Sequence, residues 1–216
     1  MKFRGLVFLA CAAFLVSSLG ASGAGAGEAL QGDGFDHTFG PSSFKMNRDA
    51  VKEETVENGL FKVVPRLTGS TVFSRFALPE YGQGRFEWTA TASVSGSRGS
   101  AAGVGLWNAD DGYVFCVYPD GSSFLRRYER NSVSWSQAAK ISGFSFPANL
   151  TIWIDANGSV LAMTNGVVVA AKLADIDLKK KASERMTSAS FVTASPPGNA
   201  AMSAHYRSLR VRATAK

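Results

Sequence analysis

Aromatic and arginine side chains are the residues whose types and spacing point most directly to ligand recognition. Trp153 alternates with Ile152 and Ile154, so in a β-strand it would point away from the aliphatic side. Trp107 follows a Gly-Val-Gly-Leu run, so in a strand it would lie opposite Val104 and Leu106, with a smooth glycine surface beside its indole. A flat ring with little bulk around it can stack on a sugar ring. The sequence therefore predicts a sugar-stacking surface on an open sheet face.

Three further residues extend this candidate site. Arg126 and Arg127 could hold an acidic ligand through bidentate hydrogen bonds. Trp135 lies in a polar stretch and is expected to be the most exposed of the four tryptophans, so the loops around it are a second candidate location for the ligand. Trp88 is expected in the core. An ordinary alternative stays open, in which the tryptophans pack inside and the arginines are solvated. The predicted ligand-binding residues are Trp107, Trp135, Trp153, Arg126 and Arg127.

No residue cluster matches a catalytic motif. His37 and His205 are the two histidines, and neither has a suitably spaced serine, cysteine or carboxylate for a triad or a metal site. Three acids, Glu53, Glu54 and Glu57, lie in a polar segment that is typical of a solvated surface. We therefore predict no catalytic residue, and the chain is read as a binding protein rather than an enzyme.

Calcium is the one cofactor that stays open as an alternative. Asp110, Asp111 and Asp120 could approach one ion through their carboxylate oxygens. These residues lie beside glycines in expected turns, where backbone hydrogen bonding already explains an aspartate. The prediction is no metal and no cofactor.

Short two-periodic segments separated by turn residues must position these side chains. Residues 85–94 alternate cleanly, and residues 101–128 form three β-prone runs divided by Asp111-Gly112 and Asp120-Gly121. A second meander is divided by Asn157-Gly158 and Asn165-Gly166. Two closing strands are expected at 188–193 and 206–212, an irregular segment at 35–58, and at most a short helix near 173–186. This pattern predicts an all-β antiparallel sandwich of two sheets.

The first residues resemble a secretory leader. Lys2 and Arg4 precede an apolar stretch and an Ala24-Gly25-Ala26 exit, so we expect a signal peptide at 1–26, a flexible lead-in at 27–34 and one domain at 35–216. Cys11 leaves a lipoprotein leader open as an alternative.

Removal of the leader would lower the net charge from +6 to +4, too mild a basicity for a nucleic-acid binder. It would also leave Cys116 without a disulfide partner, which an oxidising compartment permits. The mature chain has no apolar run long enough to span a membrane. An exported protein, periplasmic or secreted and bacterial in origin, is therefore expected; its oligomeric state is open.

The order of strands and turns resembles the concanavalin A-like lectin/glucanase jelly roll, especially its laminin-G-like and 3-keto-disaccharide hydrolase-like members. The residues that carry the resemblance are Asn58-Gly59-Leu60, the 102–106 run with Gly112-Tyr113, Asn165-Gly166 and the strand at 206–211. Laminarinase-type members carry an E-x-D-x-x-E cluster, which this sequence lacks. The resemblance implies a binding module for a carbohydrate or peptidic ligand; the alternatives are a glycoside-processing enzyme of the 3-keto-disaccharide type and an envelope interaction subunit.

Overall fold

A computed structural model describes residues 35–44, 46–77, 86–96, 99–154, 159–172, 188–195 and 202–213. All of them belong to the unit that spans Gly32–Lys216. The expected leader, the lead-in, the short helix at 173–186 and the Asn157-Gly158 turn lie outside the described residues. Within the described ranges, no helix is long and apolar enough to cross a membrane.

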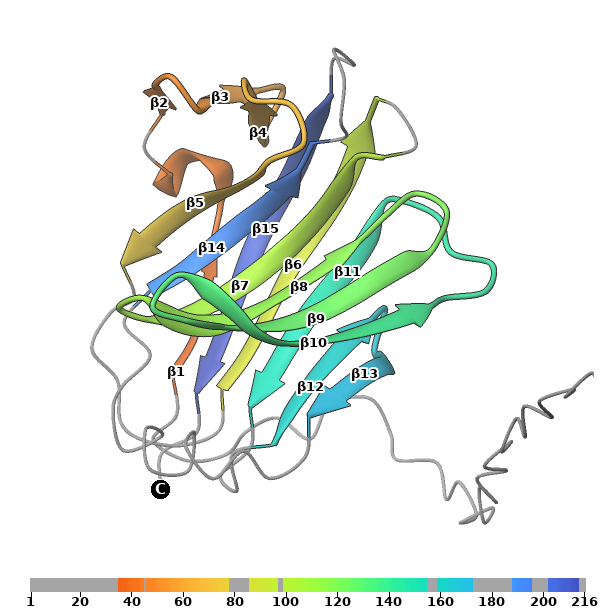
Figure 1. The fold of residues 1–216 in the computed structure, drawn as a ribbon. Coiled ribbons are helices and arrows are strands. Elements are labelled where there is room, and N and C mark those ends of the chain that lie inside the picture. Colours follow the sequence, from red (N-terminus) through yellow and green to blue (C-terminus); the bar gives the residue numbers. More distant parts are fainter. Residues whose placement is uncertain are drawn as a thin grey trace, which may run out of the picture. The chain divides into compact units, whose positions relative to one another are not determined.

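Two antiparallel sheets face one another (Figure 1). The nine-stranded sheet contains β1 (Phe35–Phe39), β2 (Asn47–Arg48), β3 (Lys52–Glu57), β4 (Leu60–Pro65), β6 (Phe86–Ser95), β11 (Ala148–Ile154), β12 (Val160–Thr164), β13 (Val167–Lys172) and β15 (Ser203–Ala213). The six-stranded sheet contains β5 (Thr71–Ala77), β7 (Ala101–Asn108), β8 (Asp111–Val117), β9 (Ser122–Glu129), β10 (Ser132–Lys140) and β14 (Ser188–Ala194). A 3₁₀ turn, η1 (Pro41–Ser43), follows β1. The predicted all-β sandwich is confirmed.

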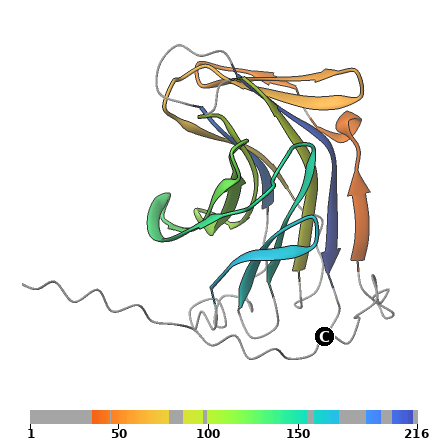
Figure 2. The same ribbon diagram turned by 90° about the vertical axis from the view of Figure 1, so that its right-hand side faces the viewer.

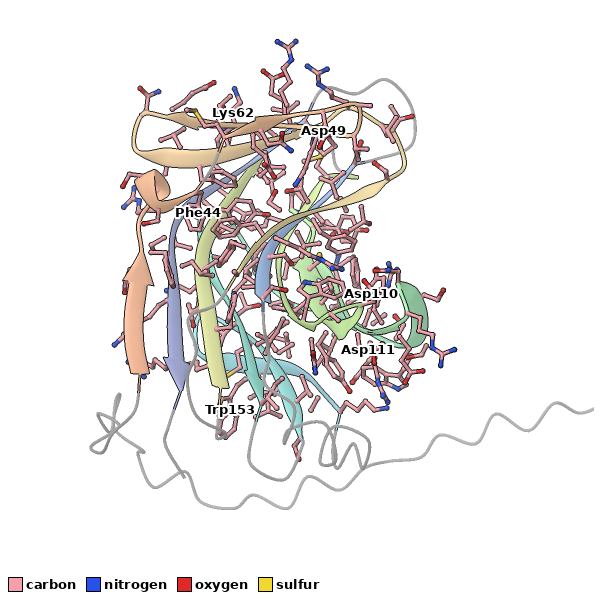
Figure 3. The ribbon with its side chains drawn as sticks, turned by 90° about the vertical axis from the view of Figure 1, so that its left-hand side faces the viewer. Phe44, Asp49, Lys62, Asp110, Asp111 and Trp153 are labelled. Atoms are coloured by element: carbon pink, nitrogen blue, oxygen red, sulfur yellow. The ribbon has the colours of Figure 1, made fainter. Side chains whose placement is uncertain are left out.

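The strand order explains how distant segments meet. The larger sheet runs β13-β12-β11-β6-β15-β4-β3-β2, with β1 also paired to β15, and the smaller runs β10-β9-β8-β7-β14-β5. The closing strands β14 and β15 therefore lie inside the sheets, each between strands from much earlier in the chain. Figures 2 and 3 show that the six-stranded sheet is curved, with its outer face on the concave side.

Alternating side chains fill the space between the sheets. Trp88 of β6 is fully buried, as predicted. The ring centroids of Phe191 and Tyr206 are 4.1 Å apart in a stacked pair, and the Tyr206 hydroxyl donates a 2.6 Å hydrogen bond to the Val192 carbonyl. Buried hydroxyls are normally hydrogen-bonded, and this hydrogen bond connects β15 of one sheet to β14 of the other.

The turns follow the expected chemistry at most positions. Asn165 and Gly166 have φ values of 51° and 81°, and Gly121 has 81°, which is the left-handed backbone that these residues adopt readily. The prediction for Asp111-Gly112 was wrong in detail. The positive φ falls on Ala109, at 50°, and Asp111 and Gly112 already belong to β8.

The segment at 35–58 is not irregular, because β1, β2 and β3 lie there. Its short, polar strands show little alternation in sequence, and pairing with β15 and β4 orders them. Glu54 is correspondingly not a solvated acid: it is 6% exposed and forms an ion pair with Lys52. The Lys52 ammonium also donates to the carbonyl of Phe73 in β5, at 2.7 Å, so the pair links the two sheets.

A candidate ligand-binding face

A second apolar cluster lies on the outer face of the six-stranded sheet. Along β8, Tyr113 and Phe115 belong to the core between the sheets, whereas Val114 and Cys116 belong to this separate cluster. The two sets alternate because successive side chains of a strand point to opposite faces. The smaller sheet therefore carries an apolar layer on both of its sides.

The strand register arranges the outer side chains in rows across β9, β8, β7, β14 and β5. The first row is Phe124, Cys116, Gly103, Val192 and Phe73; the second is Arg126, Val114, Gly105, Ser190 and Arg75; the third is Tyr128, Gly112, Trp107 and Ser188 on the first four strands. Small residues form the centre, and rings and arginines form the flanks. We call these rows, together with Tyr118, the residue that follows β8, the aromatic face.

The Trp107 indole is built into this face rather than exposed on it. Trp107 is fully buried, and its Nε1–H donates a 2.8 Å hydrogen bond to Ser190 Oγ. A Cβ atom at Gly112 would lie 2.6 Å from Cε3 of the indole, so the ring occupies the space that a side chain would need there. The predicted alternation of Trp107 with Val104 and Leu106 is confirmed, but the indole is not an open platform for a sugar.

Arg75 covers the other side of this indole. Its guanidinium carbon lies 4.0 Å from the Trp107 ring centroid, and its nitrogens donate to the Ala109 carbonyl at 3.2 Å and to Asn131 Oδ1 at 3.4 Å. The Asp110 carboxylate lies 3.9 Å away. Arg75 thus forms a strap from β5 to the turn between β7 and β8, where Figure 3 labels Asp110 and Asp111.

Arg126 occupies the opposite flank of the aromatic face. Its guanidinium carbon lies 3.9 Å from the Phe124 ring centroid, a cation–π distance. Burial raises the pKa of Tyr118 and of Tyr128; a hydrogen bond from Arg126 opposes the shift of Tyr128, and the Arg126 charge opposes both shifts. Burial also raises the pKa of the Cys116 thiol. The hydroxyls and the thiol around Arg126 are therefore neutral, and Arg126 is the charged group of this flank.

Arg127 lies on the other side of β9, because neighbouring strand residues alternate. It is paired with Glu129 at 2.6 Å, and its side chain is 11% exposed. Arg126 and Arg127 therefore cannot hold one ligand together, contrary to the expectation that groups them. The sequence missed Phe73, Arg75 and Tyr128 as members of the aromatic face, because only the register of five strands brings them together.

Trp135 lies in strand β10 and not on a loop. It is half-buried, it packs against the core between the sheets, and the Lys172 ammonium lies 5.1 Å from its ring centroid. Trp135 thus faces the inner side of the small sheet, away from the aromatic face.

Trp153 lies on the outer face of the large sheet, as its alternation predicts. It is half-buried, and its cross-strand neighbours are Glu87 and Leu161. This face is rich in paired hydroxyls, such as Thr89 and Thr151 at 2.8 Å. Figure 3 shows Trp153 far along β11, away from the Asp110–Asp111 turn. Trp107 and Trp153 thus belong to opposite outer faces of the sandwich and cannot line one site.

A hollow of about 290 Å³ opens on the same face of the large sheet. Its lining residues are Lys62, Val64, Ser95, Gly96, Met202 and Ser203. His205 adjoins it, with Nε2 3.4 Å from Ser203 Oγ. Desolvation, and then the charge of Lys62, lower the pKa of His205.

The three aspartates considered as calcium ligands each have a partner within the protein, and Asp110 lies 3.9 Å from Arg75. Asp111 Oδ1 accepts from the Arg130 backbone N–H at 2.9 Å, and Asp120 accepts from Ser122 and from Lys140. Among the described residues, no three histidine, cysteine or acidic side chains come close enough to hold a metal ion.

No protein-family model matches the chain, and no curated protein matches it in sequence. Solved structures match it in fold. A Shewanella oneidensis protein of unknown function has a TM-score of 0.52 at 9% identity, over 87% of this chain and 89% of that one. A Bacillus licheniformis β-glucanase has a TM-score of 0.51 at 12% identity, over 86% and 100%.

The catalytic domain of an endo-1,3-β-glucanase (laminarinase) from Thermotoga petrophila gives 0.50 at 12% identity, over 78% of this chain and 82% of that one. The chain has the concanavalin A-like jelly-roll fold. The predicted jelly roll is thus confirmed as a fold. At these identities the likeness carries no residue roles, because one fold serves many functions.

Proposed function

We propose that this chain is an exported, non-catalytic module that binds a carbohydrate on the aromatic face of its six-stranded sheet. The observation that carries the proposal is the layout of that face. Half-buried Phe73, Tyr118 and Arg126 lie over a layer of glycine and other small residues that is itself buried. Aromatic rings offer apolar surface to sugar C–H groups, and guanidinium and phenol groups offer hydrogen bonds to sugar hydroxyls.

Two neighbours in fold are named as glucanases, which makes carbohydrate the first ligand class to test. The test is a glycan array and affinity gels with the mature protein, followed by Kd measurements on Phe73→Ala and Tyr118→Ala. We expect each substitution to weaken binding by about five- to thirtyfold, or roughly 1–2 kcal/mol.

Trp153→Ala is the matched control, because it removes a half-buried aromatic ring from the opposite outer face. Its affinity should equal that of the unmodified protein. Loss of binding in Trp153→Ala alone would move the site to the large sheet. Retention of a peptide and of no glycan by every form would replace carbohydrate with a peptidic ligand.

An enzyme of the 3-keto-disaccharide hydrolase type is the second candidate, carried by the fold. Incubation of the mature protein with disaccharides and their 3-keto forms, with and without divalent metal, separates the two. Product formation would replace the binding proposal. A co-purifying envelope protein, with no glycan bound, would favour an interaction subunit instead.

Export is the part of the proposal that rests on the leader pattern alone. Expression of the full chain in a bacterium should yield a periplasmic or secreted product that begins at Gly27, since cleavage is expected after Ala26. Sequencing of its N-terminus checks this. An uncleaved cytoplasmic product would contradict export and leave the ligand proposal standing.

A further inference from the structure

We infer that Arg126 is the anchor of an anion-recognising subsite on the aromatic face, so that the bound carbohydrate is an acidic one that carries carboxylates. This inference rests on the proposed function. It names the ligand class and the residue that would favour acidic over neutral glycans. Three observations carry it: the absence of an acidic partner for Arg126 among the described residues, the groups that surround it, and the contacts that already occupy Arg75, the other arginine of the face.

Arg126 has no acidic partner among the described residues, although it is half-buried. The next residue, Arg127, is paired with Glu129, and Arg75 lies near Asp110. Arg130 and Arg207 are exposed, so water solvates their charges. A partly desolvated cation is costly unless an anion or hydrogen-bond acceptors meet it. Within the described part of the chain, Arg126 is therefore a partly desolvated cation with an aromatic ring and a phenol beside it but no carboxylate.

The surroundings of Arg126 suit a carboxylate ligand. Phe124 lies under the guanidinium and restricts it, which reduces the entropy lost on binding. Tyr118 and Tyr128 lie near enough for the Arg126 charge to affect the pKa of both, and as neutral phenols they can donate hydrogen bonds. Carboxylate oxygens accept a bidentate pair from a guanidinium and can accept from a hydroxyl as well.

The contacts of Arg75, the other arginine of the face, leave Arg126 as the one that can receive a carboxylate. Arg75 donates to the Ala109 carbonyl and to Asn131, and the Asp110 carboxylate lies 3.9 Å from it. The curved sheet also brings rings of the two flanks together, with the Phe73 and Tyr128 centroids 5.8 Å apart, and the small residues beneath them are buried. The geometry points to one carboxylate at Arg126, with neighbouring sugars against the half-buried rings rather than on the small residues.

The test measures the affinity of the mature protein for polygalacturonate oligomers and for the same oligomers after carboxyl reduction. We expect tighter binding of the acidic form, and Arg126→Gln should weaken it by about ten- to a hundredfold, as expected for hydrogen bonds to a charged group. Arg126→Lys should keep part of the affinity, and added salt should weaken binding. Arg127→Gln is the matched control on the opposite face and should leave the affinity unchanged.

Each result is decisive. Equal binding of acidic and reduced oligomers, with no effect of Arg126→Gln, would overturn the acidic ligand while carbohydrate binding stands. Preference for dextran sulfate over polygalacturonate would overturn the carboxylate assignment. Binding of no glycan by any form would remove the proposed function as well. Thermal unfolding of Arg126→Gln alongside the control identifies any loss that comes from misfolding.

Discussion

At the scale of single residues, Gly112 and Trp107 depend on one another. In sequence, Asp111-Gly112 resembles a turn, yet Gly112 lies in β8 with no unusual φ. The glycine is required for space, since a Cβ atom there would lie 2.6 Å from the Trp107 ring. The backbone of Leu106 is closer still.

We expect Gly112→Ala to lower the free energy of unfolding by about 1–3 kcal/mol, because overpacking forces the indole or the strand to shift. Urea denaturation measures the effect. Gly40→Ala is the control, since nothing lies within 4 Å of a Cβ atom at that position; its change should stay within about 0.5 kcal/mol. Equal stability of the two variants would show that the indole does not need the glycine.

At the scale of elements, the Lys52–Glu54 pair connects β3 in the large sheet to β5 in the small one. The side chains are 14% and 6% exposed. Breaking a buried pair leaves a charge without compensation, which costs more than the pair contributes. We expect Lys52→Met to lower the free energy of unfolding by about 3–5 kcal/mol, and Lys52→Met with Glu54→Leu to restore most of it.

The exposed pair of Lys62 with Glu57, at 3.0 Å, supplies the comparison. Lys62→Met should change the free energy of unfolding by less than about 1 kcal/mol. Denaturant titrations of the unmodified protein, the two single variants and the double variant measure these free energies of unfolding. If Lys52→Met were as mild as Lys62→Met, the link between the sheets would contribute little.

At the scale of the whole molecule, stability should fall as the solution becomes acidic, in two separate windows. The pKa of His205 is lowered in the folded state, first by desolvation and then by Lys62. Below the ordinary value of 6.5, the unfolded chain takes up a proton that the folded chain resists, so stability falls from about pH 7 downward until the folded His205 also titrates.

His205→Asn should flatten this first decline in a series of urea midpoints between pH 8 and pH 5.5. The second decline should persist in the variant, because it belongs to carboxylates. Asp120, whose pKa is lowered to about 2 by hydrogen bonds from Lys140 and Ser122, gives stability that is lost below about pH 4. An unchanged slope in His205→Asn would exclude His205 as the source.

Much of the fold followed from local patterns in the sequence. Alternation marked the faces of β7, β8 and β11, and Asn165-Gly166 marked a turn, because strand period and left-handed backbone are properties of a few adjacent residues. The polar strand β3 escaped prediction, since its order comes from pairing with β4 rather than from its own pattern. The expectation of a solvated Glu54 fails for the same reason, because the burial of this side chain comes from its partners in space.

The sequence by itself determined that Trp107 and Trp153 each point away from the aliphatic side of a strand, since direction within a strand depends only on alternation. The tertiary structure alone decided that they belong to opposite faces, that Trp135 faces inward, and that Phe73, Arg75 and Arg126 share the face of Trp107. Those facts depend on which strands pair and in what register, and register joins residues more than a hundred positions apart in the sandwich. The candidate site is therefore a property of the assembled sheet.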